Sequence, residues 1–234
     1  MNNLNLYTHT QFGDHCVCFG LVKELAKEHE RITLYTKPNN EHFLKIKQLY
    51  SSIPNVIVSP AISHFDLRIE CDKAWYEKTD KWYKHSTEPL LDQNLIFDRY
   101  WYNLANVPFE KKWDNFYFER DMNKEKNIFY NQLKLTDNDK YIFMQDDASR
   151  NFVINREYLP KNIRIIESSS LLDINILDML YIVEKALEVH VNNSSFLTFI
   201  DLMNIKRDKL FYHKYTRNVC VEQPGLRLNW QIIE

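Results

Sequence analysis

The chain has 234 residues, and its hydrophobic content of 44% is enough to fill one large core or two smaller ones. A formal net charge of -2 excludes a general electrostatic attraction for nucleic acid or for an anionic membrane surface. No stretch reaches the roughly 18 apolar residues of a membrane span, and the N-terminus lacks the pattern of a secretory signal, so we expect a cytoplasmic protein.

The first predicted feature is a buried strand over residues 4–9 that turns into an amphipathic helix through the letters TQFGDH. Gly13 can adopt backbone angles closed to other residues, and it lets a ligand approach the main chain. The N-terminus of the following helix offers unpaired N–H groups. We therefore expect Asp14, with His15 beside it, at the rim of a ligand site.

Strands and helices alternate through the first part of the chain. The pattern predicts strands over residues 31–37 and 55–60, a helix over 41–52 between them, and a further strand over 66–71. Crossovers of this length favour parallel strands covered by helices, and ligands of such sheets bind beyond the carboxyl ends of the strands.

Residues 73–135 are rich in tryptophan and tyrosine and contain no glycine. We expect helices over about 90–104 and 119–134, with a break at Pro108, which cannot continue a helix. The aromatic rings are predicted to be core of a helical bridge, and the alternative is that some of them line a groove for a sugar.

The second half restarts the alternation after the polar break at 136–140, which gives two predicted domains, 1–135 and 136–234. Two such α/β halves with parallel sheets are expected to form a cleft between them. The elements predicted in this half are strands over 141–145, 162–168, 188–193, 209–213 and 226–234, and helices over 173–187 and 194–204.

The clearest polar turn of the second half is Asn192-Asn193-Ser194-Ser195, between an apolar strand and a helix. Ser194 is a good N-cap, and the free N–H groups of the first helical turn, from Ser195 to Phe196, can cradle a phosphate with the help of the helix dipole. The alternative is that Ser194 only caps its own helix.

A second polar turn follows the strand at 141–145 and contains Asp146, Asp147, Arg150 and, further on, Arg156. A guanidinium beyond a strand end can grip a diphosphate through two parallel hydrogen bonds, and the alternative is a local ion pair between Arg150 and one of the acids. Adjacent acids on a strand point to opposite faces, which disfavours a metal site formed by this pair.

Several families lose support because their motifs are absent from the sequence: G-x-G-x-x-G, the P-loop, G-x-S-x-G and H-E-x-x-H. The four cysteines form no C-x-x-C pair and are predicted to be reduced thiols, with Cys16 and Cys18 buried on the first helix rather than nucleophilic. His190, on an apolar strand, is predicted to be a hydrogen-bonded core histidine.

Three features of the sequence belong together: Gly13-Asp14 after the first strand, the Asp-x-x-x-Arg turn, and the Asn-Ser-Ser junction between a strand and a helix. Together they resemble a glycosyltransferase of the GT-B type. The resemblance is to the heptosyltransferase-like branch and to short glycosyltransferase-like proteins of bacteria and large viruses, which would place the protein in the host cytoplasm if it is viral. It departs from that branch in its short length, in its aromatic middle, and in the loss of the glycine and histidine of the D-S-G-x-x-H signature.

The resemblance implies a fold of two Rossmann-like domains and inverting transfer of a hexosyl or heptosyl group from a nucleotide sugar to a glycan or other hydroxyl acceptor. No metal or other cofactor is implied, and Asp14 is the implied catalytic base. A nucleotide- or sugar-binding module without activity, or a nucleotide-sugar epimerase, are the alternatives. The implied substrate-binding residues are Gly13, His15, Arg150, Asn193, Ser194, Ser195 and Phe196.

Overall fold

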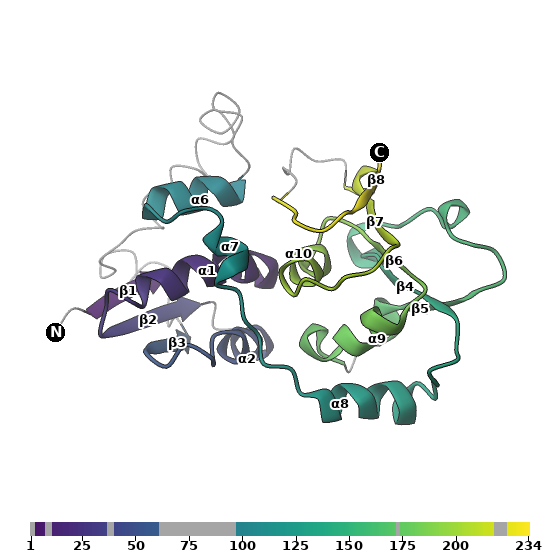
Figure 1. Cartoon of the computed structure of the whole chain (residues 1–234), viewed down its shortest axis with the longest axis horizontal. Coiled ribbons are helices and arrows are strands. Elements are labelled where there is room, and N and C mark those ends of the chain that lie inside the picture. The colour runs from purple at the N-terminus through teal and green to yellow at the C-terminus, as the bar shows by residue number, and fades with distance from the viewer. Residues whose placement is uncertain (1–2, 8–10, 37–39, 61–96, 172–173, 218–223) are drawn as a thin grey trace. The chain divides into compact units, whose positions relative to one another are not determined.

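The computed structural model describes residues 3–7, 11–36, 40–60, 97–171, 174–217 and 224–234 (Figure 1). The chain divides into two compact units, Met1–Phe118 with Glu222–Gly225, and Glu119–Val221 with Leu226–Glu234. Both units are α/β with parallel sheets, as the strand and helix alternation predicts. A GT-B arrangement with a cleft stays a prediction.

The N-terminal unit contains a parallel sheet in the order β1-β2-β3. Its apolar positions alternate along the strands, so that Leu4, Leu6, Ile32 and Leu34 are all buried. The predicted strand at 66–71 lies outside the described residues. The elements are β1 (Asn3–Tyr7), α1 (Phe12–Leu25), β2 (Arg31–Thr36), α2 (Asn40–Leu49) and β3 (Val56–Pro60).

Two helices of the aromatic segment, α6 (Phe97–Ala105) and α7 (Lys111–Asp114), pack on α1. The close approach of α7 depends on Gly20, because a Cβ atom there would overlap the main-chain carbonyl of Lys111. Trp101 and Tyr102 are buried in this contact, as predicted for core aromatics. Residues 73–96 lie outside the described residues.

A buried ion pair joins these helices to the returning C-terminal segment. Lys112 Nζ lies 2.6 Å from Asp98 Oδ2 and donates to the carbonyl of Gly225 at 2.6 Å. The same Asp98 oxygen accepts the Gly225 N–H at 3.0 Å. Both charged side chains are at most 1% exposed, so each supplies the charge that the other needs away from water.

The C-terminal unit has a five-stranded parallel sheet in the order β5-β4-β6-β7-β8. β4 and β6 are buried along their whole length; β4 is apolar up to Gln145, as expected of a buried parallel strand, whereas β6 also buries Glu188 and His190. The strands are β4 (Tyr141–Gln145), β5 (Arg164–Glu167), β6 (Glu188–Val191), β7 (Leu210–His213) and β8 (Gln231–Ile233), and the helices are α8 (Met122–Asn127), α9 (Leu180–Lys185) and α10 (Ser195–Leu202).

Two predicted helices are shorter than expected, because each begins later in the chain and part of each is a 3-10 or π-helical turn. Asp121 accepts the Lys124 N–H and starts α8, which passes into a π-helical turn over Ile128–Gln132. In place of a helix over 173–187, Asn175 caps a 3-10 turn at Ile176–Asp178, and α9 follows.

Residues 119–135, which the sequence predicts to belong to the N-terminal domain, pack on the C-terminal unit. Arg120 donates to the carboxylates of Glu125 and Glu184 at 2.6–3.0 Å. Glu125 is buried and also accepts the Tyr181 N–H at 2.7 Å. These charge-assisted bonds fix the segment to α9, whereas the polar stretch 136–140 is only a surface turn.

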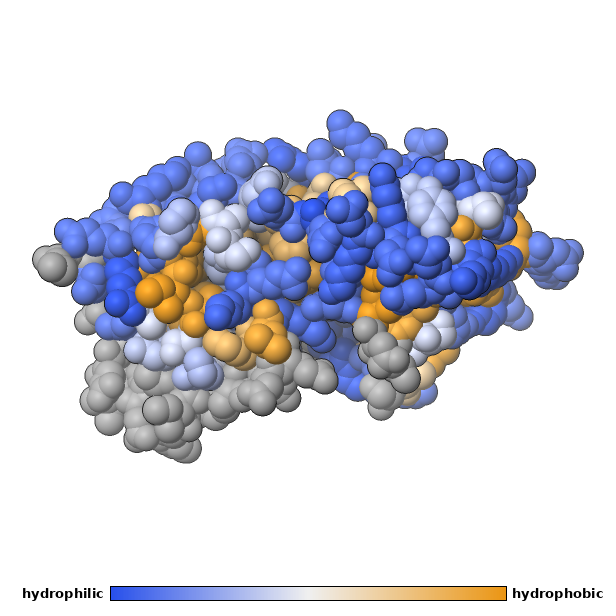
Figure 2. Space-filling model, turned by 90° about the horizontal axis from the view of Figure 1, so that it is seen from below, coloured by the Kyte–Doolittle hydropathy of each residue, from blue (hydrophilic) through white to orange (hydrophobic). Residues whose placement is uncertain are grey.

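Polar residues cover most of the face drawn in Figure 2, and apolar residues form separate patches on it. Individual large apolar side chains such as Leu44, Tyr117 and Val153 are exposed, as is usual for globular proteins. Within the described part of the chain, no helix has the length and apolar character needed to cross a membrane.

We predict that Lys112→Met destabilises the protein by about 3 kcal/mol, because the buried Asp98 carboxylate would lose its counter-charge. Urea denaturation of the whole chain measures the change in the free energy of unfolding. Lys27→Met is the matched control, since Lys27 is exposed where it pairs with Glu24 at 2.7 Å and should have little effect. Equal midpoints for the two variants would contradict the assigned role of the Lys112 pair.

Candidate functional site

The carboxyl ends of β4 and β6 form the topological switch point of the C-terminal sheet, where the strand order reverses. From β4 the chain continues to β5 on one side, while β6 lies on the other side of β4. Ligands of open α/β sheets bind outside the strand ends at such a switch point. The two polar turns identified in the sequence, after residue 145 and after residue 191, both begin here.

The turn after β6 is tied to the end of β4 through Gln145. The Ser194 hydroxyl donates to Gln145 Oε1 at 2.6 Å, and the Asn192 N–H donates to the Gln145 carbonyl at 3.3 Å. Ser194 is the N-cap residue of α10, with an extended backbone, but its side chain makes no capping hydrogen bond. The capping hydrogen bond expected of the Ser194 side chain is therefore absent, and a phosphate site at this turn stays a prediction.

The first turn of α10 presents main-chain N–H groups at the strand ends. Its first helical hydrogen bond runs from the Thr198 N–H to the Ser194 carbonyl at 3.4 Å, so the amides of residues 195–197 precede the helical ladder. Asn193, Ser194, Ser195 and Phe196 are all partly exposed. The predicted phosphate-binding residues thus lie together at the positive end of a helix dipole.

The turn after β4 is a tight loop closed by main-chain bonds between Asp147 and Phe152, 2.9 Å in each direction. Asn151 takes the left-handed conformation, with φ of 59°, which lets the chain reverse. Arg150 forms an ion pair with Asp147, so the predicted local salt bridge is confirmed. Arg150 is 56% exposed, and an exposed pair of this kind is weak enough to yield to a stronger anion.

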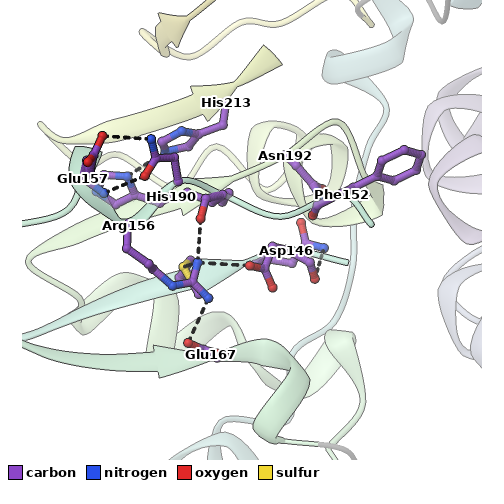
Figure 3. A network of polar contacts seen from close by, with 12 residues as sticks. Asp146, Phe152, Arg156, Glu157, Glu167, His190, Asn192 and His213 are labelled. Carbon is purple, nitrogen blue, oxygen red and sulfur yellow. Dashed lines mark hydrogen bonds and ion pairs between the residues drawn. The ribbon is translucent and has the colours of Figure 1, made fainter. Parts of the chain in front are cut away.

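Arg156, the other arginine predicted to follow β4, belongs to a structural network instead (Figure 3). Its guanidinium lies 3.0 Å from both Asp146 Oδ2 and Glu167 Oε1, and it donates to the Ile154 carbonyl at 3.0 Å. The negative charge of Asp146 is thereby paired with the positive charge of Arg156. Among the described residues, no cluster of three or more His, Cys, Asp or Glu side chains could hold a metal ion.

His190 is a core histidine, as predicted. Its Nδ1 lies 2.9 Å from His213 Nε2, its Nε2 lies 3.2 Å from Glu188 Oε2, and its ring stacks on Phe211. Both histidines are fully buried. Burial lowers the pKa of His190, while burial together with the neighbouring His190 lowers the pKa of His213 to about 4.

The N-terminal turn differs from its prediction in two respects, the backbone of Gly13 and the position of His15, which is not at the rim of a site. Gly13 lies inside the first turn of α1, and no described glycine has a positive φ, so the expected special backbone angles are wrong. The Asp14 carboxylate accepts the Gln11 N–H at 3.0 Å and so helps to begin the helix. His15 is 1% exposed, with Nε2 3.5 Å from Thr36 Oγ1, which places its ring in the core.

Cys16 and Cys18 are free, buried thiols, as predicted. Burial, reinforced by the negative charge of Asp14, raises the pKa of both thiols well above the usual value. A nucleophilic role, which requires a thiolate, is therefore disfavoured in this environment.

Three residues of the strand-end site were missed by sequence reasoning: Gln145, Phe152 and Arg217. Arg217 donates from Nη1 to the Asn193 carbonyl at 3.1 Å, although the two residues are 24 positions apart. Gln145 ends an apolar run and could have been noticed as a polar strand terminus. Nothing in the local sequence around Arg217 indicates this contact, because it depends on the pairing of β6 with β7.

No protein-family model matches the sequence, and no significant match to a curated protein is found. Among solved structures, the chain is similar to "the glycosyl transferase family 9 from Veillonella parvula DSM 2008" at 10% identity. That alignment covers 91% of this chain and 79% of the other, with a TM-score of 0.44. A TM-score below 0.5 does not establish a shared fold, so the function proposed below rests on the residues of this chain.

The buried histidines predict a loss of stability in acid. Because the pKa of each is lowered in the folded state, the unfolded chain gains protons first as the pH falls below about 6.5. The contribution of the two histidines to the free energy of unfolding is fully present above that pH and is lost as the pH falls toward 4. We expect the histidines to account for a loss on the order of 1–2 kcal/mol between pH 7.5 and pH 5, measured by urea denaturation.

His213→Gln separates this effect from the titration of other groups. The variant removes the more strongly shifted imidazole and should flatten the dependence of the unfolding free energy on pH over this range. Parallel profiles for the variant and the wild type would contradict the assignment.

Proposed function

We propose that the protein is a glycosyltransferase that moves a sugar from a nucleotide-sugar donor to a glycan or other hydroxyl acceptor, with inversion and without a metal. The observation that carries the proposal is the strand-end site of the C-terminal unit. There the N-terminus of α10 and the exposed Arg150 lie at the switch point between β4 and β6. This combination is suited to an anionic, diphosphate-bearing ligand.

In the proposed mechanism, the diphosphate of the donor accepts hydrogen bonds from the amides of residues 195–197 and from Arg150. These groups stabilise the negative charge that develops on the leaving nucleoside diphosphate as the glycosidic bond breaks. Fixed donors of this kind contribute roughly 3–4 kcal/mol each to the transition state, so a metal is not required by the charge balance. Arg150 would exchange its pair with Asp147 for the ligand.

Asp14 is the proposed base that accepts the proton of the acceptor hydroxyl. Its carboxylate has one oxygen bonded to the Gln11 N–H, and it is partly exposed at the start of α1. A partly exposed carboxylate can be reached by the hydroxyl group of an acceptor, which is what a general base requires. Gly13, beside it, is the proposed point of close approach for the acceptor.

The same hydrogen bond favours a second candidate, a nucleotide- or sugar-binding module without catalysis. Asp14 completes a capping interaction with Gln11, which explains its presence without any chemistry. Such a module would retain the strand-end site of the C-terminal unit and would bind nucleotide sugars without consuming them.

Ser195→Pro tests the phosphate site. Proline is well tolerated at the first position of a helix, so the variant should fold normally while it loses one N–H group at the proposed diphosphate. We expect about a tenfold or greater loss of affinity for a nucleoside diphosphate, measured by calorimetry over a panel of ADP, GDP, UDP and CDP.

Ser195→Ala is the matched control, because it removes the side chain but keeps the N–H group. It should bind the same nucleotide with nearly wild-type affinity. Equal affinities for the proline and alanine variants would contradict binding of the phosphate at the α10 amides.

Asp14→Asn tests the base. An asparagine oxygen can still accept the Gln11 N–H, so the helix start is preserved while the basic carboxylate is lost. If the protein transfers sugar, we expect the turnover rate to fall by about a hundredfold or more, with the affinity for nucleoside diphosphate unchanged.

Asp14→Ala is the companion variant, since it removes both the base and the cap. It should show the same loss of turnover together with a decrease in stability of about 1 kcal/mol. Unchanged turnover in Asp14→Asn would remove Asp14 from the base role. Binding of nucleotide sugars by the wild type without transfer or hydrolysis would favour the binding module.

A further inference from the structure

Two arginines from different loops hold their guanidinium groups near the same aromatic ring, that of Phe152. The Arg150 guanidinium carbon lies 5.4 Å from the ring centroid, and that of Arg217 lies 5.5 Å from it. Each is within the range of a cation–π interaction. In Figure 3 the ring of Phe152 points away from the network around Arg156.

The main chain of Phe152 is fixed by hydrogen bonds. Phe152 closes the loop after β4 through its two main-chain bonds to Asp147, and its carbonyl also accepts from Asn192 Nδ2 at 3.2 Å. Phe152 is therefore attached to both β4 and the end of β6. Its ring, near both guanidinium groups, therefore starts from a main chain that is bonded to the strand ends.

Arg217 reaches the site from the segment after β7, which passes through the 3-10 turn Lys214–Thr216. Its Nη1 donates to the carbonyl of Asn193, the residue before the N-cap of α10. Arg217 thus lies beside the turn that begins the helix, and Arg150 comes from the turn after β4. Two cations from separate loops therefore lie near one ring, and one of them contacts the turn that begins α10.

An independent feature of the same turn is a buried acceptor. Asn192 is 1% exposed, and its Oδ1 accepts no hydrogen bond from the residues that the structure describes. The amide orientation is fixed, since Nδ2 donates to the Phe152 carbonyl. A buried acceptor of this kind calls for a donor such as a hydroxyl group.

We propose that Arg217 and Arg150 form a two-guanidinium clamp around Phe152 that binds the diphosphate of the ligand, and that Asn192 Oδ1 accepts a hydrogen bond from a hydroxyl of the same ligand. The identity of the ligand as a nucleoside diphosphate or nucleotide sugar rests on the proposed function. Arg217 is a ligand-binding residue that the sequence motifs do not include.

The chemistry of the clamp favours a diphosphate over a single phosphate. A guanidinium binds phosphate oxygens through a planar pair of N–H groups, so two of them suit two linked phosphates. Without a ligand, Arg150 is paired with Asp147 and Arg217 donates to the Asn193 carbonyl, while both lie near the electron-rich ring. In the proposed complex, the diphosphate takes the place of Asp147 at Arg150.

Arg217→Gln tests the clamp, with calorimetric titration of a nucleoside diphosphate, the matching nucleoside monophosphate and inorganic pyrophosphate. We expect the affinity for the diphosphate and for pyrophosphate to fall about tenfold or more, and that for the monophosphate to fall less. Arg164→Gln is the matched control: it loses the same charge at the start of β5, at the opposite end of the strands, and should bind as the wild type does.

A second measurement needs no variant and covers the case in which Arg217→Gln fails to fold. Phenylglyoxal modifies accessible arginines, and mass spectrometry of the wild-type chain reports modification at each site. We expect pyrophosphate to protect Arg217 and Arg150 but not Arg164. Modification of Arg217 that is unaffected by saturating pyrophosphate would overturn the clamp.

The outcomes separate the clamp from the transferase. Unchanged binding of the diphosphate by Arg217→Gln overturns the clamp and leaves the proposed function standing. Binding of pyrophosphate that depends on Arg217, without binding of any nucleoside diphosphate, supports the clamp and overturns the nucleotide-sugar ligand. A wild-type chain that binds neither pyrophosphate nor a nucleoside diphosphate overturns both.

Discussion

The candidate site of the C-terminal unit depends on the junction between the end of β4 and the turn after β6. Parallel pairing ends where the two strands diverge, and beyond that point the main chain has to find other partners. Gln145 supplies them: its carbonyl accepts the Asn192 N–H and its side chain accepts the Ser194 hydroxyl. The hydroxyl is oriented by this bond, and it makes no capping hydrogen bond to α10, so the helix begins with its amides uncovered by its own side chain.

The face of the sheet that carries this junction is covered by an irregular segment rather than by a long helix. Ile154 and Leu159 of that segment pack on Ile142 and Met144 of β4. The neighbouring polar groups are paired in the Arg156 network and in the contact between His190 and His213. A loop that covers a sheet leaves polar groups buried, and hydrogen bonds and ion pairs such as these stabilise the cover.

Several residues of the candidate site have a structural role that is sufficient to explain them. Asp14 begins a helix, Arg150 pairs with Asp147, and Ser194 bonds to Gln145. These roles differ in strength, however, because the Arg150 pair is exposed and the Ser194 bond is half-buried. Ligand binding is compatible with the weak, exposed interactions, which can be exchanged at little cost.

The sequence by itself determined the α/β alternation, the approximate strand positions and the two polar turns, because hydrophobic periodicity and turn residues are local properties of the chain. It also identified His190 as a core residue, since an apolar strand surrounds it. The starts of α8 and α9 were misjudged: Asp121 caps α8 after residue 119, and Asn175 caps a 3-10 turn where the pattern predicts the first turns of a helix.

Only the tertiary structure decided which distant residues share the site. The order of the strands placed the turn after β4 beside the turn after β6, and the pairing of β7 with β6 brought Arg217 to the Asn193 carbonyl. It also showed that Gly20, not Gly13, is the glycine on which close packing depends, since the carbonyl of Lys111 lies against it. Contacts between residues far apart in the chain follow from how strands and helices pack, and no local pattern of the sequence contains that information.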